Sequence, residues 1–299
     1  MKRLLLHLDT SPNASVFDRI VAYDGGADEV LSYSGLTADA VRDLVHGAIF
    51  TRGPKDLHNT AIFIGGTDMN AGEQLLAGVK NAFFGPMRVS VMLDSNGSNT
   101  TAVAAVAKLV QTASDVRGKR VVVVAGTGPV GTRAAGLLAR AGANVTITSR
   151  HPEEAERVAK QIRERFGGAV DTAIVTDPSA LAGSLGDAEL LLNAGPAGVQ
   201  LVPHDAWADR RGLRVAMDLN AVPPLGIDGV EVTDAAVDRN HVKTFGALGV
   251  GNFKMKVHKR CIAKLFERND LVLDAETIGD VARELLPSAP GSASVPPPG

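Results

Sequence analysis

Residues 117–131 read RGKRVVVVAGTGPVG and place four valines directly before a glycine-rich turn. Val121–Val124 carry apolar side chains toward both faces of a strand, as the central strand of a parallel sheet requires. Gly126, Gly128 and Gly131 follow in the register G-x-G-x-x-G and open a helix-like segment. Together these features predict an α/β fold built on a Rossmann-type, doubly wound parallel sheet.

The glycine-rich turn is the predicted phosphate-binding site of this sheet. Gly126 is expected to permit the tight turn, Gly128 to let a pyrophosphate approach the backbone, and Gly131 to let helix and strand pack closely. Free amides at the start of the helix would face the phosphates. A purely structural glycine turn is the alternative. The predicted cofactor contacts in this segment are Gly126, Thr127, Gly128, Pro129, Val130 and Gly131.

The next strand, NVTITS at 144–149, is followed by Arg150 rather than by an acid. A carboxylate at this strand end normally hydrogen-bonds the ribose 2′-hydroxyl of NAD, and it would repel a 2′-phosphate. Ser149 can donate a hydrogen bond, and Arg150 can offer a bidentate fork to phosphate oxygens. The pair therefore predicts NADP as the cofactor. A solvated Arg150, with NAD also accepted, is the alternative.

Two later strand ends complete the predicted cofactor cleft, because ligands of open α/β sheets gather at the carboxyl ends of the strands. The segment NAGPAG at 193–198 is expected near the nicotinamide-side ribose, and DLNAVPPLG at 218–226 beside the nicotinamide. The predicted contacts are Asn193, Ala194, Gly195 and Asn220. Both asparagines can equally be turn-forming residues.

The composition restricts the class of protein. The chain has 299 residues and 45% hydrophobic content, enough for two domains with full cores. A formal net charge of −2 does not favour nucleic-acid binding. The single cysteine, Cys261, excludes an intrachain disulfide and fits a reducing cytoplasm. The apolar run Leu4–Leu6 is too short for a signal peptide, and no segment approaches the ~20 apolar residues of a membrane span. We therefore expect a soluble, cytoplasmic protein without membrane contacts.

Alternating strand-like and helix-like segments predict a smaller α/β domain at residues 1–116, followed by the Rossmann domain at 117–250. Helices within 251–286 are expected to pack back on the first domain. The tail at 287–299 is rich in Pro, Ser and Gly and is expected to be flexible.

Local signals add further expectations about helix ends. Thr37 and Asp274 are expected to cap helices, and Ser98 or Asn99 to start a buried helix that connects the two domains. The glycine-rich segment Gly246–Gly251 is expected to be a flexible hinge that allows the domains to close.

The chain also resembles a known family over nearly its whole length, up to about residue 285. The resemblance rests on long motifs, which include TAIFIGGTDMNAGE (60–73), MLDSNGSNTTA (92–102), AGTGPVG (125–131), NAVPPLGIDG (220–229) and FGALGVGNFKMKVHKRCIAKLF (245–266). They are similar to the NAD(P)-dependent methylene-tetrahydromethanopterin dehydrogenases of methylotrophic and related bacteria.

The resemblance implies a pterin-binding domain and an NADP domain separated by a cleft that closes on both substrates. It implies reversible hydride transfer from methylene-tetrahydromethanopterin to NADP+ during formaldehyde oxidation, and a homo-oligomer, expected to be a trimer. Because a hydride leaves a carbon flanked by two nitrogens and no proton moves, neither a general acid nor a general base is obligatory. The histidines show no spacing typical of metal ligands, so no metal is expected.

Polar side chains in the pterin-side segments form the candidate substrate site. The aspartates can hydrogen-bond a pterin's amino and ring N–H groups or stabilise a nascent cation, although each can equally be a helix cap or turn residue. Ser95 and Ser98 are expected to be caps. Lys254 and His258 share a helix face, whereas Lys256 points elsewhere, and a solvated basic helix is the alternative. The predicted catalytic residues are Asp18, Lys254 and Lys256, and the predicted substrate contacts are Asp24, Asp94, Asn96 and Asn99.

Three other functions remain open at this point. A methylene-tetrahydrofolate dehydrogenase would use the same NADP domain, although neither Tyr23 nor Tyr33 is followed by a lysine four residues on, as a cyclohydrolase site of the folate type requires. A quinate or shikimate dehydrogenase would need a Lys–Asp pair for proton transfer, formed by Asp94 with Lys55 or Lys119. A non-catalytic redox sensor would bind NADP without turning it over.

Overall fold

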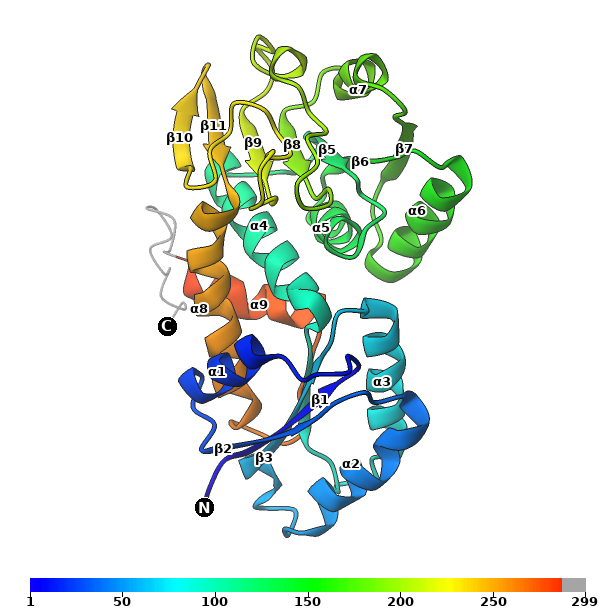
Figure 1. Cartoon of the computed structure of the whole chain (residues 1–299), viewed down its shortest axis with the longest axis vertical. Coiled ribbons are helices and arrows are strands. Elements are labelled where there is room, and N and C mark those ends of the chain that lie inside the picture. The colour runs from blue at the N-terminus through cyan, green and yellow to red at the C-terminus, as the bar shows by residue number, and fades with distance from the viewer. Residues whose placement is uncertain (287–299) are drawn as a thin grey trace, which may run out of the picture.

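The computed structural model describes residues 1–286, so the segment 287–299, for which a flexible tail is predicted, lies outside the described residues. Two sheets lie at opposite ends of the molecule, and helices fill the space between them (Figure 1). Neighbouring strands run parallel within each sheet, except for one antiparallel strand at an edge of the second sheet. The predicted α/β fold with a Rossmann-type sheet is confirmed. Within residues 1–286 no helix is long and apolar enough to cross a membrane.

The second sheet contains the four-valine strand at its centre, as predicted. Strand β5 lies between β8 and β6 and pairs with both in parallel, and the side chains of Val121–Val124 are buried. The edge hairpin of β10 and β11 is antiparallel, and its β10 strand was not predicted. The strand order is β10–β11–β9–β8–β5–β6–β7, with bounds Ala235–Arg239, Val242–Phe245, Val215–Asp218, Leu190–Asn193, Arg120–Val124, Asn144–Ser149 and Val170–Ile174.

The first sheet is parallel, and its carboxyl ends carry charged residues. Strand β1 ends at Asp9, which pairs in register with Gly65 at the end of β3, and Asp94 directly follows β4. The last strand comes from the C-terminal part of the chain and pairs with β4. The strand order is β12–β4–β3–β1–β2, with bounds Val272–Leu273, Ser90–Leu93, Thr60–Gly65, Leu4–Asp9 and Glu29–Tyr33.

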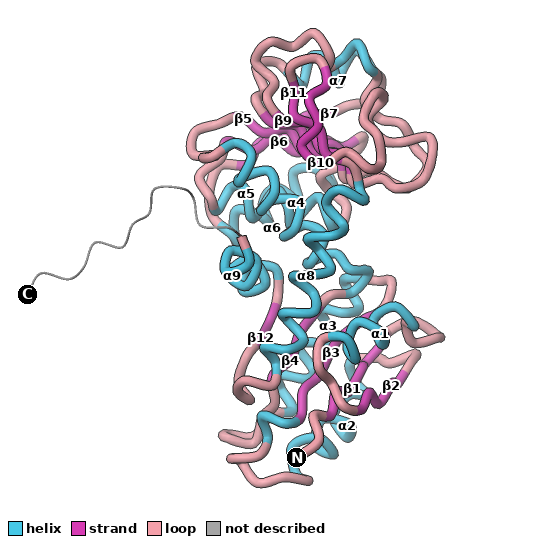
Figure 2. The backbone as a smooth tube through the Cα atoms, turned by 90° about the vertical axis from the view of Figure 1, so that its left-hand side faces the viewer, coloured by secondary structure: helices cyan, strands magenta, loops and turns pink. Residues whose placement is uncertain are grey.

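Helices α4, α5, α8 and α9 occupy the middle of the molecule, between the two sheets (Figure 2). Helix α4 packs against α5, α8 and α9, which explains why it carries apolar residues on more than one face. Helix α9 begins at a capping box formed by Asp274 and Thr277, so the predicted cap is confirmed. The helix bounds are Val16–Asp24 (α1), Val41–Phe50 (α2), Met69–Ala82 (α3), Ser98–Ala113 (α4), Pro129–Arg140 (α5), Pro152–Phe166 (α6), Pro178–Leu185 (α7), Ala247–Leu265 (α8) and Ala275–Leu285 (α9).

Three predicted caps are wrong. Thr37 precedes a short 3-10 turn and makes no capping hydrogen bond. Helix α4 starts at Ser98, as predicted, but its N-cap is Gly97, in the left-handed region at φ 59°, so Ser98 is not the cap and no side chain caps the helix. Ser95 instead donates from its hydroxyl to the carbonyl of Gly65, at 2.9 Å, and so ties the end of β3 to the loop after β4.

The segment Gly246–Gly251 is not a flexible hinge. Gly246 is the N-cap of α8, and the residues that follow it are helical. A Cβ atom on Gly246 would lie 2.0 Å from the carbonyl oxygen of Glu231, and one on Gly249 would lie 1.8 Å from that of Asp234. These glycines therefore let the helix approach a neighbouring loop closely, a packing requirement that the sequence pattern did not distinguish from flexibility.

Candidate active site

The glycine-rich turn joins β5 to α5, as predicted, but the structural role of Gly126 differs from the predicted one. The residue with positive φ is Ala125, at 54°, rather than Gly126. Gly126 lacks a side chain because a Cβ would lie 2.6 Å from the Cβ of Ile147, so its predicted role in the turn is corrected to packing. Gly131 packs closely against Ala125 and Gly126, as expected. Gly128 meets only an ordinary 3.6 Å contact, which leaves its face open for a ligand.

A cavity of about 440 Å³ extends from this turn to the end of β6. Ser149 is buried, and its hydroxyl accepts a hydrogen bond from the backbone N–H of His151 at 3.2 Å. Arg150 is exposed, and within residues 1–286 its guanidinium makes no hydrogen bond or ion pair. A guanidinium available at this strand end, beside the open glycine turn, fits the 2′-phosphate of NADP. The lining residues include Ala125, Thr127, Thr148, Ser149, Arg150, His151, Glu154, Thr176, Asp177 and Pro196.

Asn193 and Asn220 take the turn-forming role that the sequence left open. Asn193 donates from its amide to the carboxylate of Asp218 at 2.8 Å and accepts from the N–H of Gly195 at 3.2 Å. The side-chain oxygen of Asn220 accepts from the N–H of Val222 at 2.9 Å. Their side chains therefore shape the loops after β8 and β9.

On the side of the first sheet, the structure brings together three predicted residues from three elements: Asp18 on α1, Asp94 after β4 and Lys254 on α8. Burial raises the pKa of each aspartate to about 6, and the positive charge of Lys254 opposes that shift in both. Asp94 is fully buried and accepts from the N–H and the hydroxyl of Thr100, at 2.9 and 2.6 Å. The ammonium nitrogen of Lys254 lies 2.6 Å from where a Cβ on Gly97 would stand, and the φ of 59° at Gly97 independently favours glycine.

Sequence reasoning assigned no role to three buried residues beside this cluster, His258, His7 and Asp9. His258 stacks on Phe63 with ring centroids 5.5 Å apart, and its Nδ1 lies 4.0 Å from Asp94 Oδ2. Burial, followed by the charge of Lys254, lowers the pKa of His258 to about 3, so the ring is neutral. His7 Nε2 lies 3.4 Å from Asp9 Oδ2, and both side chains are buried. The available signal was a histidine and an aspartate inside the otherwise apolar strand LLLHLD.

Three other predicted residues lie at the surface. Asp24 forms an ion pair with Lys259 at 2.7 Å, and both side chains are about half exposed. Lys256 is exposed on α8. Asn96 is exposed at φ 55°, and its backbone N–H donates to the carbonyl of Gly66 at 2.6 Å.

Asn99 is buried, and both polar atoms of its side chain are hydrogen-bonded within the protein. Its amide donates to the carbonyl of Leu93 at 2.6 Å, and its oxygen accepts from Nε of Arg133 at 2.6 Å. The side chain thus links the loop that carries Asp94 to helix α5 of the second sheet, rather than offering a hydrogen bond to a ligand.

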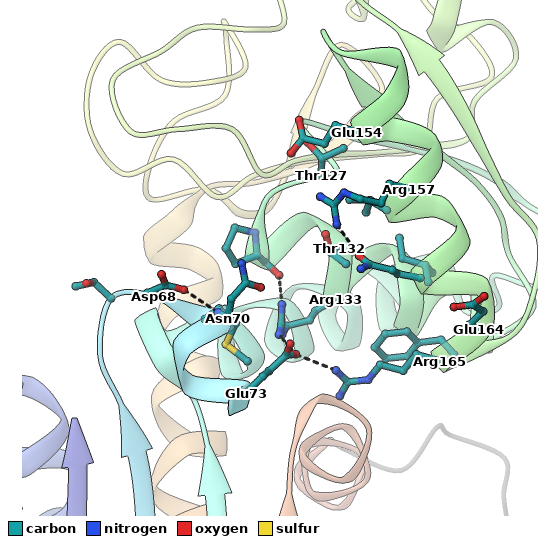
Figure 3. A pocket seen from close by; sticks show the side chains of 17 residues that line it. Asp68, Asn70, Glu73, Thr127, Thr132, Arg133, Glu154, Arg157, Glu164 and Arg165 are labelled. Carbon is teal, nitrogen blue, oxygen red and sulfur yellow. Dashed lines mark hydrogen bonds and ion pairs between the residues drawn. The ribbon is translucent and has the colours of Figure 1, made fainter. Parts of the chain in front are cut away.

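A second cavity, of about 690 Å³, lies between helix α3 and helices α5 and α6 (Figure 3). Glu73 of α3 forms ion pairs across this cleft with Arg133 of α5 at 2.7 Å and with Arg165 of α6 at 3.2 Å. The glycine turn contributes Thr127 and Pro129 to the same wall. The cleft therefore runs from the phosphate-binding turn to the start of α3.

Comparisons with known proteins agree with this arrangement. A family model described as methylene-tetrahydromethanopterin dehydrogenase, N-terminal, matches residues 16–96, and one described as putative NAD(P)-binding matches residues 112–202. The crystal structure of shikimate 5-dehydrogenase from Listeria monocytogenes, in complex with shikimate and NAD, has a TM-score of 0.59 at 14% identity and covers 95% of this chain and 96% of its own. That likeness shows a shared fold.

Two proteins of Methylorubrum extorquens are similar over nearly the whole chain. The bifunctional protein MdtA is 47% identical over 285 residues, which cover 95% of this chain and 99% of that protein. The NAD(P)-dependent methylenetetrahydromethanopterin dehydrogenase is 34% identical over 298 residues, with the same coverage of 95% and 99%. Since both matches span almost the full length of both partners, this chain belongs to the methylene-tetrahydromethanopterin dehydrogenase family.

Proposed function

We propose that the protein catalyses reversible hydride transfer from methylene-tetrahydromethanopterin to NADP+, giving methenyl-tetrahydromethanopterin and NADPH in one-carbon metabolism. The observation that carries the proposal is the pairing of two half-sites. One is the open glycine turn beside Arg150, and the other is the cluster of Asp18, Asp94 and Lys254 at the carboxyl ends of the first sheet. Bound NADP+ supplies the hydride acceptor.

The charges of the cluster suit the reaction. When the methylene carbon loses a hydride, positive charge develops over the two nitrogens that flank it. Asp18 and Asp94 have pKa values of about 6 and are ionised above neutral pH, whereas His258 is neutral there. With Lys254 protonated, the three charged groups sum to one negative charge, which favours a cation nearby. Because the carboxylates are already desolvated and fixed, they stabilise that charge without reorganisation.

The proposed roles follow from position. Asp18 holds the reduced pterin, the buried charge of Asp94 helps to stabilise the cation, and Lys254 keeps the two carboxylates ionised. Lys256, exposed on α8, receives no proposed role in the chemistry. On the other side, Ser149 and Arg150 bind the 2′-phosphate and favour NADP over NAD.

The test is a two-by-two kinetic comparison of methylene-tetrahydromethanopterin and methylene-tetrahydrofolate with NADP+ and NAD+, followed at the absorbance of the methenyl product. The proposal expects the highest kcat/KM for the tetrahydromethanopterin substrate with NADP+. Absence of product with either pterin, combined with tight NADP+ binding, would refute the enzymatic function and support a redox sensor. A higher kcat/KM with methylene-tetrahydrofolate would show that the folate, rather than the tetrahydromethanopterin compound, is the preferred substrate.

A further inference from the structure

Arg133 makes three hydrogen bonds, one to α4, one to α3 and one to the first turn of its own helix α5. Figure 3 shows its ion pair with Glu73 across the cleft. Arg133 lies on α5 and is only 6% exposed. Nε donates to the side-chain oxygen of Asn99 at 2.6 Å, Nη1 donates to the carbonyl of Pro129 at 3.0 Å, and Nη2 donates to the carboxylate of Glu73 at 2.7 Å. Each donating edge of the guanidinium therefore holds a different part of the molecule.

Each partner belongs to one wall of the proposed active site. Pro129 is the first residue of α5, directly after the glycine turn. Asn99 also binds the carbonyl of Leu93, which precedes Asp94, and Thr100, the residue after Asn99, holds the Asp94 carboxylate. The third partner, on α3, comes from the opposite side of the cleft. One buried side chain thus ties the first turn of α5, the helix that follows the glycine turn, to the loop that carries Asp94 and to α3.

We propose that Arg133 is a positioning residue that sets the separation between the bound dinucleotide and the bound pterin, an inference that rests on the proposed function. It touches no reacting atom and acts through the glycine turn and the Asp94 loop. Hydride transfer requires the two reacting carbons about 3–3.5 Å apart, and a displacement of about 1 Å lowers the rate by about a hundredfold. A planar guanidinium fixes the angles between its three partners, whereas a lysine ammonium does not.

The kinetic test compares Arg133→Lys and Glu73→Gln with a matched control, Arg210→Lys. Arg210 also donates three hydrogen bonds, to the carbonyls of Ala182, Gly186 and Ala206, but all three acceptors lie on one side of the second sheet. Glu73→Gln changes a half-exposed carboxylate, so it tests the same connection with less risk to folding.

The expected signature is a loss of rate without a loss of binding. In single turnover with the methylene pterin deuterated at the transferred position, Arg133→Lys is expected to lower hydride transfer by about a hundredfold with a full isotope effect. Glu73→Gln is expected to lower it by a smaller factor, and the NADP dissociation constant is expected to change little in either. Arg210→Lys is expected to transfer hydride at the wild-type rate. A weakening of NADP binding that accounts for the whole loss would overturn the proposal, as would wild-type rates in both folded variants.

A measurement of the distance between α3 and α6 tests whether Arg133 fixes the two walls of the cleft relative to each other, and it does not depend on enzymatic activity. Lys80 on α3 and Lys160 on α6 are both exposed, so spin labels at Lys80→Cys and Lys160→Cys report the distance between two helices that line the cleft. Labelling is selective because Cys261 is buried and burial raises the pKa of its thiol. Arg133→Lys is expected to broaden the distance distribution and Arg210→Lys to leave it unchanged. An unchanged distribution in Arg133→Lys would overturn the positioning role, whereas an inactive wild-type enzyme with an intact distance response would refute only the proposed function.

Discussion

The carboxylate of Asp94 is expected to destabilise the folded protein at neutral pH. Burial raises its pKa from 3.8 to about 6, so the folded state binds the proton more tightly than the unfolded chain does. Below about pH 4 both states are protonated and the group has no effect. Between about pH 4 and 6 stability falls, and above pH 6 the full penalty is present. The gap between the two pKa values corresponds to about 3 kcal/mol.

Replacing Asp94 with Asn removes this charge and keeps the shape. The new amide can accept from the N–H of Thr100 and donate to its hydroxyl, which can then donate to the carbonyl of Gly97, 3.4 Å away. The free energy of unfolding of Asp94→Asn, relative to wild type, is therefore expected to rise by about 2–3 kcal/mol between pH 4 and pH 7. Hydride transfer is expected to fall by about a hundredfold, because the developing cation loses a fixed negative charge.

Urea unfolding between pH 4 and 7, followed by circular dichroism, measures the stability difference directly. In Thr100→Val, which removes a hydroxyl that lowers the pKa of Asp94, the loss of stability is expected to extend to higher pH. A difference between Asp94→Asn and wild type that does not change with pH would refute the buried-charge reasoning. Full activity of Asp94→Asn at pH 7 would separately refute the role of this carboxylate in stabilising the cation.

Three further predictions follow from single contacts. Arg150→Ala is expected to raise the KM for NADP+ by about ten- to thirtyfold and to leave the KM for NAD+ nearly unchanged, because an exposed hydrogen bond between charged groups contributes about 1.5–2 kcal/mol. An equal rise in KM for both cofactors would contradict the contact between Arg150 and the phosphate. Gly249→Ala is expected to lower the free energy of unfolding by about 1–3 kcal/mol, because the new Cβ would lie 1.8 Å from a carbonyl oxygen. Gly251→Ala, whose Cβ would have nothing within 4 Å, is expected to raise it by up to about 1 kcal/mol. Similar melting temperatures for the two variants would contradict the packing role of Gly249 and favour a flexible hinge. Asp24→Ala breaks a half-exposed ion pair with Lys259, so it is expected to change the free energy of unfolding by less than about 1 kcal/mol. The variant is also expected to keep the wild-type kcat and KM when the methenyl product is followed. A large rise in the KM for the pterin would show that Asp24 contacts the substrate.

The dinucleotide half of the site could be predicted because its signals are local. Val121–Val124, the glycine spacing and the charge of Arg150 all lie within a short stretch, and the helix that follows constrains their geometry. The individual glycine roles could not be predicted. Whether Gly126 needs its missing side chain for a turn or for packing depends on Ile147, which comes from a neighbouring strand.

The substrate half of the site shows where local reasoning ends. Asp94 and Asn99 stand in the same polar loop, and both fit a pterin-binding residue by type. Their roles differ in the structure because the side-chain oxygen of Asn99 accepts a hydrogen bond from Arg133. Arg133 lies on α5, which is distant in sequence, so no local pattern reveals this contact. His258 was overlooked for the opposite reason, since a histidine on an apolar helix face is usually part of a core. In this chain it lies 4.0 Å from a buried carboxylate without any hydrogen bond among the described residues. A buried polar side chain that makes no hydrogen bond is destabilising, and this feature of His258 can be recognised only once the fold has brought the residues together.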